Sequence, residues 1–224
     1  IYTFGIVTKN NTKNENDKAK ILQLLERKIP QDSFLARWLG FNHFLAWPDS
    51  MTGLALDSLP NIEALKINKN YREHILVIDV SDRKPFAIWC LKKNSPEECF
   101  WFDEKGVIFR ESPSAAGTVV KVISDYSQDR LRVSSLGIPE AFLSNFLSVL
   151  EIVATSGLPV QNITLTDLKL EEIEVSTLEG PKVYFSLRYP AETYLSVLQS
   201  LIANPAFSHF EYIDLRVPNR VFYK

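Results

Sequence analysis

The stretch that decides the fold is residues 60–109, PNIEALKINKNYREHILVIDVSDRKPFAIWCLKKNSPEECFWFDEKGVIF. Residues 62–67 begin an alternation of apolar and polar side chains, which is typical of a half-buried strand. A turn is expected at residues 68–70. Residues 75–80 then form a second short run, rich in β-branched side chains and too short for a helix of its own. This pattern predicts two strands in succession.

The second half of that stretch starts a new set of strands. Pro85 closes the preceding strand, because proline lacks the N–H group that a central ladder needs. Residues 86–91 resume strand composition, and residues 101–109 have the pattern of a hairpin with Gly106 at the position that needs a positive φ. We therefore expect a joint between two structural units at Pro85.

Before residue 60 the sequence indicates one strand and two helices. Residues 1–8 have strand composition, and residues 17–28 carry apolar side chains at helical spacing before Pro30, which is expected to end the helix. Residues 48–59 suggest a second, short helix opened by Pro-Asp-Ser. The expected order is strand, helix, helix, strand, strand, which can make a three-stranded sheet with both helices on one face.

The part that follows Pro85 reads as longer strands interrupted by two helices. Residues 139–156 give the clearest helix, which begins at a proline and ends at Gly157-Leu158-Pro159. A last helix starts at residue 190 or 191 and stops at Asn204-Pro205. The expected strands are residues 118–123, 131–133, 163–170, 173–177, 182–187, 210–217 and 221–223.

Four segments together resemble one known family. They are FLAWPDSMTGLALDSLPNIEALKI (44–67), HILVIDVSDRKPFAIW (74–89), CFWFDEKGVIF (99–109) and YIDLRVPNRVFYK (212–224). Their order and spacing are similar to the bacterial cell-division protein FtsQ, also called DivIB. The resemblance covers roughly residues 44–224.

The resemblance implies an α+β fold with two domains. A small POTRA domain with a three-stranded sheet and two helices would occupy residues 1–84. A larger mixed α/β domain with a curved sheet, the FtsQ-like β-domain, would occupy residues 85–224. In that family a cytoplasmic tail and one transmembrane helix precede the POTRA domain, so the resemblance implies that both are missing from this sequence. It also places the chain at the cytoplasmic membrane, on the extracytoplasmic, periplasmic side.

The function implied is that of a non-enzymatic scaffold of the division machinery. It would link early division proteins to the FtsB/FtsL (DivIC/FtsL) pair and help to control septal peptidoglycan synthesis. Two other hypotheses stay open at this point. One is a POTRA-containing module of another envelope assembly, for outer-membrane insertion or secretion. The other is an extracytoplasmic thiol hydrolase, which would need a reactive thiolate.

Composition narrows the function classes. The chain has 224 residues, 46% of them hydrophobic and 23% charged, as in an ordinary globular protein. Its net charge of −2 argues against nucleic-acid binding, which favours a concentrated basic face. No apolar run approaches the roughly 20 residues that cross a bilayer as a helix.

The residues that could carry chemistry form no catalytic or metal-binding motif. The three histidines, His43, His74 and His209, lack metal-ligand spacing, and no glycine-rich phosphate loop is present. We therefore expect no catalytic residues, no metal and no cofactor. Cys90 and Cys99 flank a polar loop, and they are either a disulfide across a hairpin or two reduced, buried thiols.

The C-terminal strand is the candidate partner-binding site. Residues 210–217 can join the sheet late and lie at or near an open edge, where charged side chains prevent self-association and a partner segment can add a strand. The resemblance implies that an FtsB-type partner is held at this end. The expected contact residues are Tyr212, Ile213, Asp214, Leu215, Arg216 and Val217, flanked by Val221, Phe222 and Tyr223.

Overall fold

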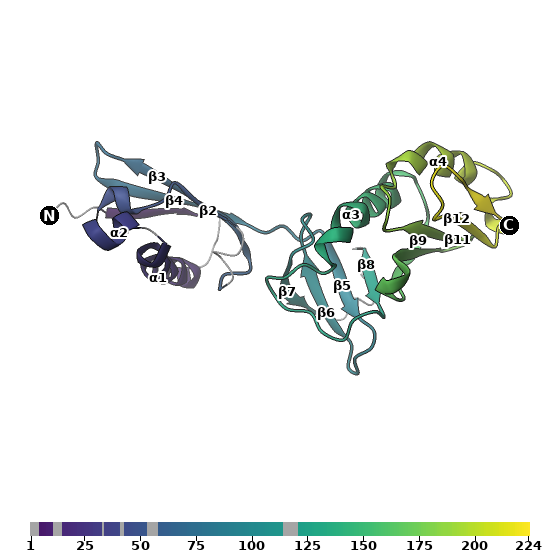
Figure 1. Ribbon diagram of the computed structural model, residues 1–224, viewed down its shortest axis with the longest axis horizontal. Helices are drawn as coiled ribbons and strands as arrows, with labels where there is room; N and C mark the ends of the chain where they lie inside the picture. The colour runs from purple at the N-terminus through teal and green to yellow at the C-terminus, as the bar shows by residue number, and fades with distance from the viewer. Residues whose placement is uncertain (1–4, 11–14, 33, 41–42, 53–57, 114–120) are drawn as a thin grey trace. The chain divides into compact units, whose positions relative to one another are not determined.

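The computed structural model describes residues 5–10, 15–32, 34–40, 43–52, 58–113 and 121–224. The chain divides into two compact units, Ile1–Lys84 and Pro85–Lys224 (Figure 1). The boundary falls at Pro85, where the sequence changes from helix-rich to strand-rich patterning. The fold is α+β, with a few helices and one large mixed sheet. Within the described residues no helix is both long enough and apolar enough to cross a membrane.

Unit 1, Ile1–Lys84, is built on a four-stranded sheet in the order β1-β4-β3-β2. β1 runs parallel to β4, and the other neighbours are antiparallel. The strands are β1 (Gly5–Asn10), β2 (Ser50–Thr52), β3 (Ile62–Asn70) and β4 (Ile75–Asp82). The helices are α1 (Glu15–Asp32), α2 (Phe34–Leu39) and the short 3-10 helix η1 (Phe44–Ala46).

The core of unit 1 joins α1 to the sheet. Four buried residues spaced along α1 belong to the same apolar cluster as the inward side chains of β3 and β4. This is the helical stripe that the sequence predicts. The cluster contains Ile21, Leu24, Leu25 and Ile29 from α1, Leu65 and Ile67 from β3, Leu76 and Ile78 from β4, and Trp47.

Two predictions for the middle of unit 1 are wrong. The expected helix at residues 48–59 begins instead with the strand β2, whose Met51 lies opposite Leu65, and residues 53–57 lie outside the described part of the chain. Pairing with β3 outweighs the local helix-start signal there, and it makes the sheet four-stranded rather than three-stranded. The second helix is α2, which lies earlier in the sequence.

Two boundaries in unit 1 also differ from expectation. The β3–β4 turn lies after Asn70 rather than at residues 68–70, because the Asn70 side chain accepts hydrogen bonds from the backbone N–H groups of Arg72 and Glu73. Such a bond stabilises a turn that begins, rather than ends, at an asparagine. Pro30 lies inside α1, which ends two residues later at Asp32.

Unit 2, Pro85–Lys224, holds a nine-stranded mixed sheet in the order β13-β12-β11-β10-β9-β8-β5-β6-β7. Its strands are β5 (Ala87–Leu91), β6 (Glu98–Phe102), β7 (Ile108–Ser112), β8 (Val122–Asp125), β9 (Val160–Leu165), β10 (Glu172–Thr177), β11 (Lys182–Ser186), β12 (Tyr212–Leu215) and β13 (Phe222–Tyr223). Its helices are α3 (Glu140–Thr155) and α4 (Leu195–Ile202), with 3-10 turns η3 (Leu168–Leu170), η4 (Glu192–Tyr194) and η5 (Phe207–His209).

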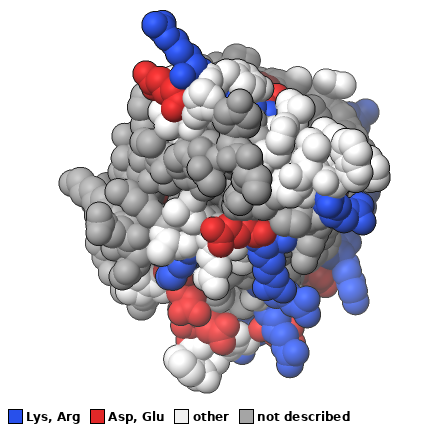
Figure 2. All heavy atoms as spheres, turned by 90° about the vertical axis from the view of Figure 1, so that its left-hand side faces the viewer, with Lys and Arg blue, Asp and Glu red and all other residues white. Residues whose placement is uncertain are grey.

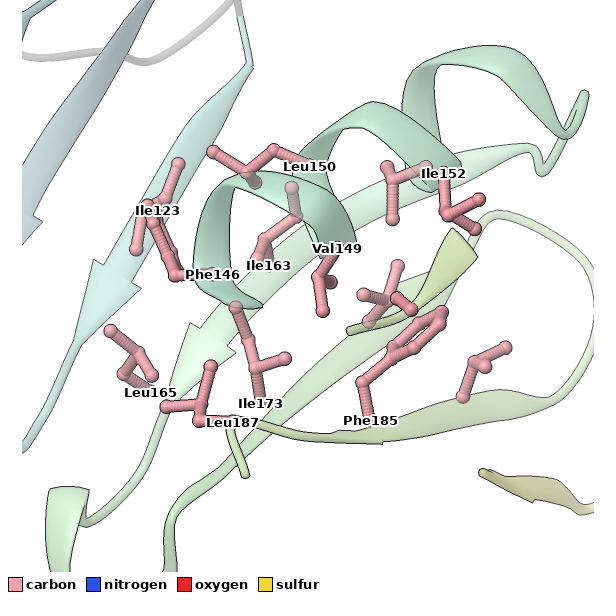
Figure 3. Packing of buried hydrophobic residues seen from close by; sticks show 14 of the residues in the cluster. Ile123, Phe146, Val149, Leu150, Ile152, Ile163, Leu165, Ile173, Phe185 and Leu187 are labelled. Carbon is pink, nitrogen blue, oxygen red and sulfur yellow. The ribbon is translucent and has the colours of Figure 1, made fainter. Parts of the chain in front are cut away.

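The core of unit 2 forms where α3 packs on the sheet (Figure 3). The helix begins directly after Pro139 and ends before Ser156 and Gly157, as the sequence predicts. Phe146, Val149 and Leu150 on α3 face the inward side chains of the strands. Those strand residues include Ile123, Ile163, Leu165, Ile173 and Phe185, and Leu187 joins them from the bend just after β11.

The β6–β7 connection is the hairpin expected from Gly106. This glycine has a φ of 74°, and an added Cβ would stand 2.5 Å from Leu143 Cδ1, so both the backbone and the space favour glycine. The side chain of Asp103 accepts hydrogen bonds from the backbone N–H groups of Lys105 and Val107 and so shapes the turn.

Three strand predictions in unit 2 need correction. Residues 131–133 are not a strand; the segment after them is held to β7 instead, since Ile108 N–H donates to Ser135 O and Ser134 N–H donates to Ile108 O. Residues 118–120 lie outside the described residues, and β8 begins at Val122. β9 ends at Leu165, because Asp167 caps the 3-10 turn η3 with its side chain.

Candidate partner-binding edge

The sheet of unit 2 ends in two short strands. β12 pairs in parallel with β11 on one side and antiparallel with β13 on the other, where Ile213 lies opposite Tyr223 and Asp214 lies opposite Phe222. β12 therefore lies one strand in from the edge, and β13 forms the edge itself. The sequence placed residues 210–217 at or near an open edge. β12 lies near that edge, and the edge itself is formed by residues that were expected only to flank the contact site.

The predicted contact residues divide between core and surface. Ile213 and Leu215 are buried in the main apolar cluster, because alternate residues of a strand point to opposite faces. Their side chains are not available to a partner. Tyr212, Asp214 and Val221 are half-buried, and the exposed members are Arg216, Val217, Phe222 and Tyr223. Phe222 is 45% exposed and Tyr223 56% exposed.

The backbone of β13 has one side turned away from the sheet. Lys224 N–H donates to Tyr212 O (3.3 Å), so the polar backbone groups of Lys224 face β12. Successive residues of a strand direct these groups to opposite sides. The N–H and C=O of Tyr223 therefore point outward, where another strand can pair with them.

Side chains hold this strand end in place. The ring of Tyr223 packs on Phe210, with centroids 5.0 Å apart, and Lys224 Nζ lies 3.0 Å from the Glu211 carboxylate. On the turn between β12 and β13, the Tyr194 hydroxyl donates to Val217 O (3.0 Å). Burial raises the pKa of Tyr194, so this hydroxyl keeps its proton and stays a donor at neutral pH.

A charged cluster lies beside the edge on the outward face of the last strands. Arg216 bonds Asp214 (2.7 and 2.9 Å) and Glu172 (2.6 Å), and its guanidinium stands 4.9 Å from the centroid of the Tyr184 ring. The hydrogen bonds from Arg216 lower the pKa of Asp214, and the two carboxylates raise the pKa of Arg216. Asp214 and Arg216 are thus charged at neutral pH, and the guanidinium is held between two carboxylates.

Sequence reasoning missed two members of this cluster. Glu172 begins β10 and pairs with Arg216 across the sheet. Tyr184 lies opposite Asp214 in the β11–β12 ladder. The alternation of Glu172, Glu174, Lys182 and Tyr184 with buried residues was the available signal.

Cys90 and Cys99 lie opposite each other in the β5–β6 ladder, and their sulfurs are bonded. Of the two alternatives from the sequence, the structure has the disulfide. Glu97 Oε1 lies 3.2 Å from Cys99 Sγ, and the three side chains are close enough to hold a metal ion if the sulfurs were free. In the disulfide neither sulfur is a thiolate. Cys90 and Cys99 therefore provide neither thiolate ligands for a metal ion nor a thiol nucleophile.

The histidines do not meet in one site. His43, His74 and His209 are exposed and belong to η1's flank, the β3–β4 turn and η5, respectively. No protein-family model matches this chain, and no curated protein does either.

Proposed function

We propose that this chain is a non-enzymatic scaffold of the bacterial division machinery, on the extracytoplasmic side of the cytoplasmic membrane. Unit 1 would serve as a POTRA-type domain that meets early division proteins. The edge of unit 2 would hold an FtsB/FtsL (DivIC/FtsL) pair and so help to control septal peptidoglycan synthesis. The family resemblance of residues 44–224 supports the proposal, together with the division of the chain at Pro85.

The observation that carries the proposal is the edge strand β13. It is two residues long, its Phe222 and Tyr223 side chains are about half exposed, and the backbone of Tyr223 points outward. A partner segment in extended conformation can add itself as a tenth strand through main-chain hydrogen bonds. The side chains of Val217 and Phe222 beside it would select the partner sequence.

The position of the edge changes the mutation that best tests the proposal. A proline at Leu215 would break the β11–β12 ladder next to Phe185 and disturb the core, so loss of binding would be ambiguous. A proline at Val217 is also unsuitable, because its fixed φ would disturb the turn whose Val217 carbonyl accepts from the Tyr194 hydroxyl. Tyr223 is better, since its N–H is not directed at β12.

The first experiment is a titration of the whole chain with the purified extracytoplasmic parts of the FtsB/FtsL-type pair, followed by hydrogen exchange. We expect saturable binding and slower exchange of backbone amides at residues 212–224. Protection confined to unit 1, or no binding at all, would contradict the proposal. Binding to an outer-membrane or secretion component instead would favour a module of another envelope assembly.

A further inference from the structure

The short helix α2 in unit 1 exposes its large apolar side chains. Ala36, a small residue, is the one that this helix buries, whereas Phe34 and Trp38 are 72% and 77% exposed. With about 100° of rotation per residue, Phe34 and Trp38 lie about 40° apart on the side of the helix opposite Ala36. A surface helix normally places its large apolar residues inward. The two largest side chains of α2 thus contribute little to the core of unit 1.

Two leucines extend this apolar surface. Leu35 on α2 is 43% exposed, and Leu45 in the adjoining η1, which contacts α2, is 53% exposed. We call Phe34, Leu35, Trp38 and Leu45 the α2 patch. Scattered exposed apolar residues are ordinary, but a group gathered on neighbouring elements is typical of a surface that binds something apolar.

The charged residues near the α2 patch indicate what kind of apolar partner it binds. Residues 33–48 contain no aspartate and no glutamate, and the exposed Arg37 lies in the last turn of α2. Figure 2 faces the side of unit 1 on which α2 lies, and it shows uncharged side chains at the upper right, with several Lys and Arg side chains and some Asp and Glu side chains below them. Helices that lie at a lipid interface typically combine tryptophan, phenylalanine and leucine with arginine and lack acidic residues.

We propose that the α2 patch docks on the surface of a lipid bilayer with anionic headgroups. Phe34 and Trp38 insert at the boundary between headgroups and acyl chains, and Arg37 pairs with headgroup phosphates. A helix that projects large rings outward fits a deformable plane, whereas a protein partner would need a preformed groove for them. This inference does not depend on the proposed function, because it concerns unit 1 alone.

The test combines flotation and fluorescence with the whole chain and vesicles at millimolar lipid. One set of vesicles is phosphatidylcholine, and the other contains one third phosphatidylglycerol. We expect the parent chain to float with the anionic vesicles, and the F34S/W38S variant to bind them about tenfold more weakly. R37Q should bind the anionic vesicles about fivefold more weakly and leave binding to phosphatidylcholine unchanged.

Trp38 supplies a direct optical signal. It is far more exposed than the other three tryptophans, so its emission should shift to shorter wavelength with lipid and be quenched by brominated acyl chains. F34S retains Trp38 and should lose most of that shift. L178S is the matched control, since Leu178 is 65% exposed but lies in unit 2; it should bind vesicles like the parent.

Three results would overturn the proposal. They are absence of vesicle binding by the parent, equal binding by the parent and F34S/W38S, and equal loss of binding in L178S. A concentration-dependent dimer that F34S/W38S abolishes, without vesicle binding, would assign the α2 patch to a second copy of the chain. Circular dichroism of each variant checks that unit 1 stays folded. None of these results bears on partner binding at β13.

Discussion

At the scale of single residues, unit 2 depends on one buried carboxyl group. Asp125 is fully buried at the end of β8, and it accepts hydrogen bonds from the Trp89 indole (2.9 Å), from Ser127 and from Gln128. The Gln128 amide also donates to Gly137 O. This network joins β5, β8 and the chain leading to α3, and it satisfies polar groups that would otherwise be unpaired in the core.

Replacing Asp125 by alanine should destabilise unit 2 strongly. The buried Trp89 N–H would lose its acceptor and the Gln128 amide would keep only Gly137 O, which together cost about 3 kcal/mol in free energy of unfolding. Urea unfolding of the parent and of D125A measures the difference. The exposed Asp129 supplies the control D129A, which should change stability little. Equal midpoints for all three chains would show that the network is not needed.

A second residue-scale prediction concerns pH. Hydrogen bonds from Arg216 lower the pKa of Asp214 in the folded chain below its unfolded value of about 4. Asp214 therefore adds stability that is present above about pH 4 and is lost as pH falls through the folded pKa. The D214N variant should be less stable than the parent at pH 7, by under about 1 kcal/mol because the pair is partly exposed.

The measurement is urea unfolding of the parent and of D214N from pH 7 down to about pH 2. The difference between them should shrink towards zero at the acid end, since Asp214 is then protonated in both states of the parent. D129N, which carries the same change at an exposed position, should follow the parent throughout. A difference that grows as pH falls would contradict the assigned role of Arg216.

At the scale of elements, the spacing of apolar residues predicted the helices and strands that bury one face. It failed for strands whose position depends on pairing with a segment distant in sequence. The stripe of α1 and the alternation of β3 are confirmed, because burial of one face leaves a period that local sequence retains. β2 could not be found this way, since three residues carry no period and its pairing with β3 is set elsewhere in the chain. The edge position of β13 was hidden for the same reason.

The candidate site shows the same division between local and distant information. The exposed residues around β13 follow from local alternation and composition. The bond between Arg216 and Glu172 joins strands 44 residues apart in sequence, and no local pattern reveals it. Likewise Cys90 and Cys99 could be paired only once their strands were in register.

The β5–β6 hairpin carries a prediction of its own. The disulfide closes a loop of about ten residues, so breaking it should lower the free energy of unfolding by about 2–3 kcal/mol. Urea unfolding of the parent with and without dithiothreitol measures this loss. A variant with both cysteines replaced by alanine should be insensitive to dithiothreitol. If reduction leaves the stability of the parent unchanged, the bond does not contribute to unit 2.

At the scale of the whole molecule, the chain consists of two units with separate apolar cores. One core contains α1 with β3 and β4, and the other contains α3 with the nine-stranded sheet. Separate cores allow separate folding. Such an organisation suits a scaffold, because different partners can bind different units.

Each unit should fold when it is made alone. We expect Ile1–Lys84 and Pro85–Lys224 to give circular dichroism spectra that sum to that of the whole chain, and limited proteolysis to yield a stable fragment cut near Lys84. Each fragment should also unfold cooperatively in urea. If both fragments are unfolded and no such fragment accumulates, the two units are not independent.

The central claim is that a partner strand pairs with the backbone of β13. Two variants at one position test it: Y223P and Y223V both remove the ring, but only Y223P removes the outward N–H. Affinity for the FtsB/FtsL-type pair, measured by calorimetry on the whole chain, should fall about tenfold further in Y223P than in Y223V. Equal affinities of Y223P and Y223V, with both variants folded, would contradict strand addition at this edge.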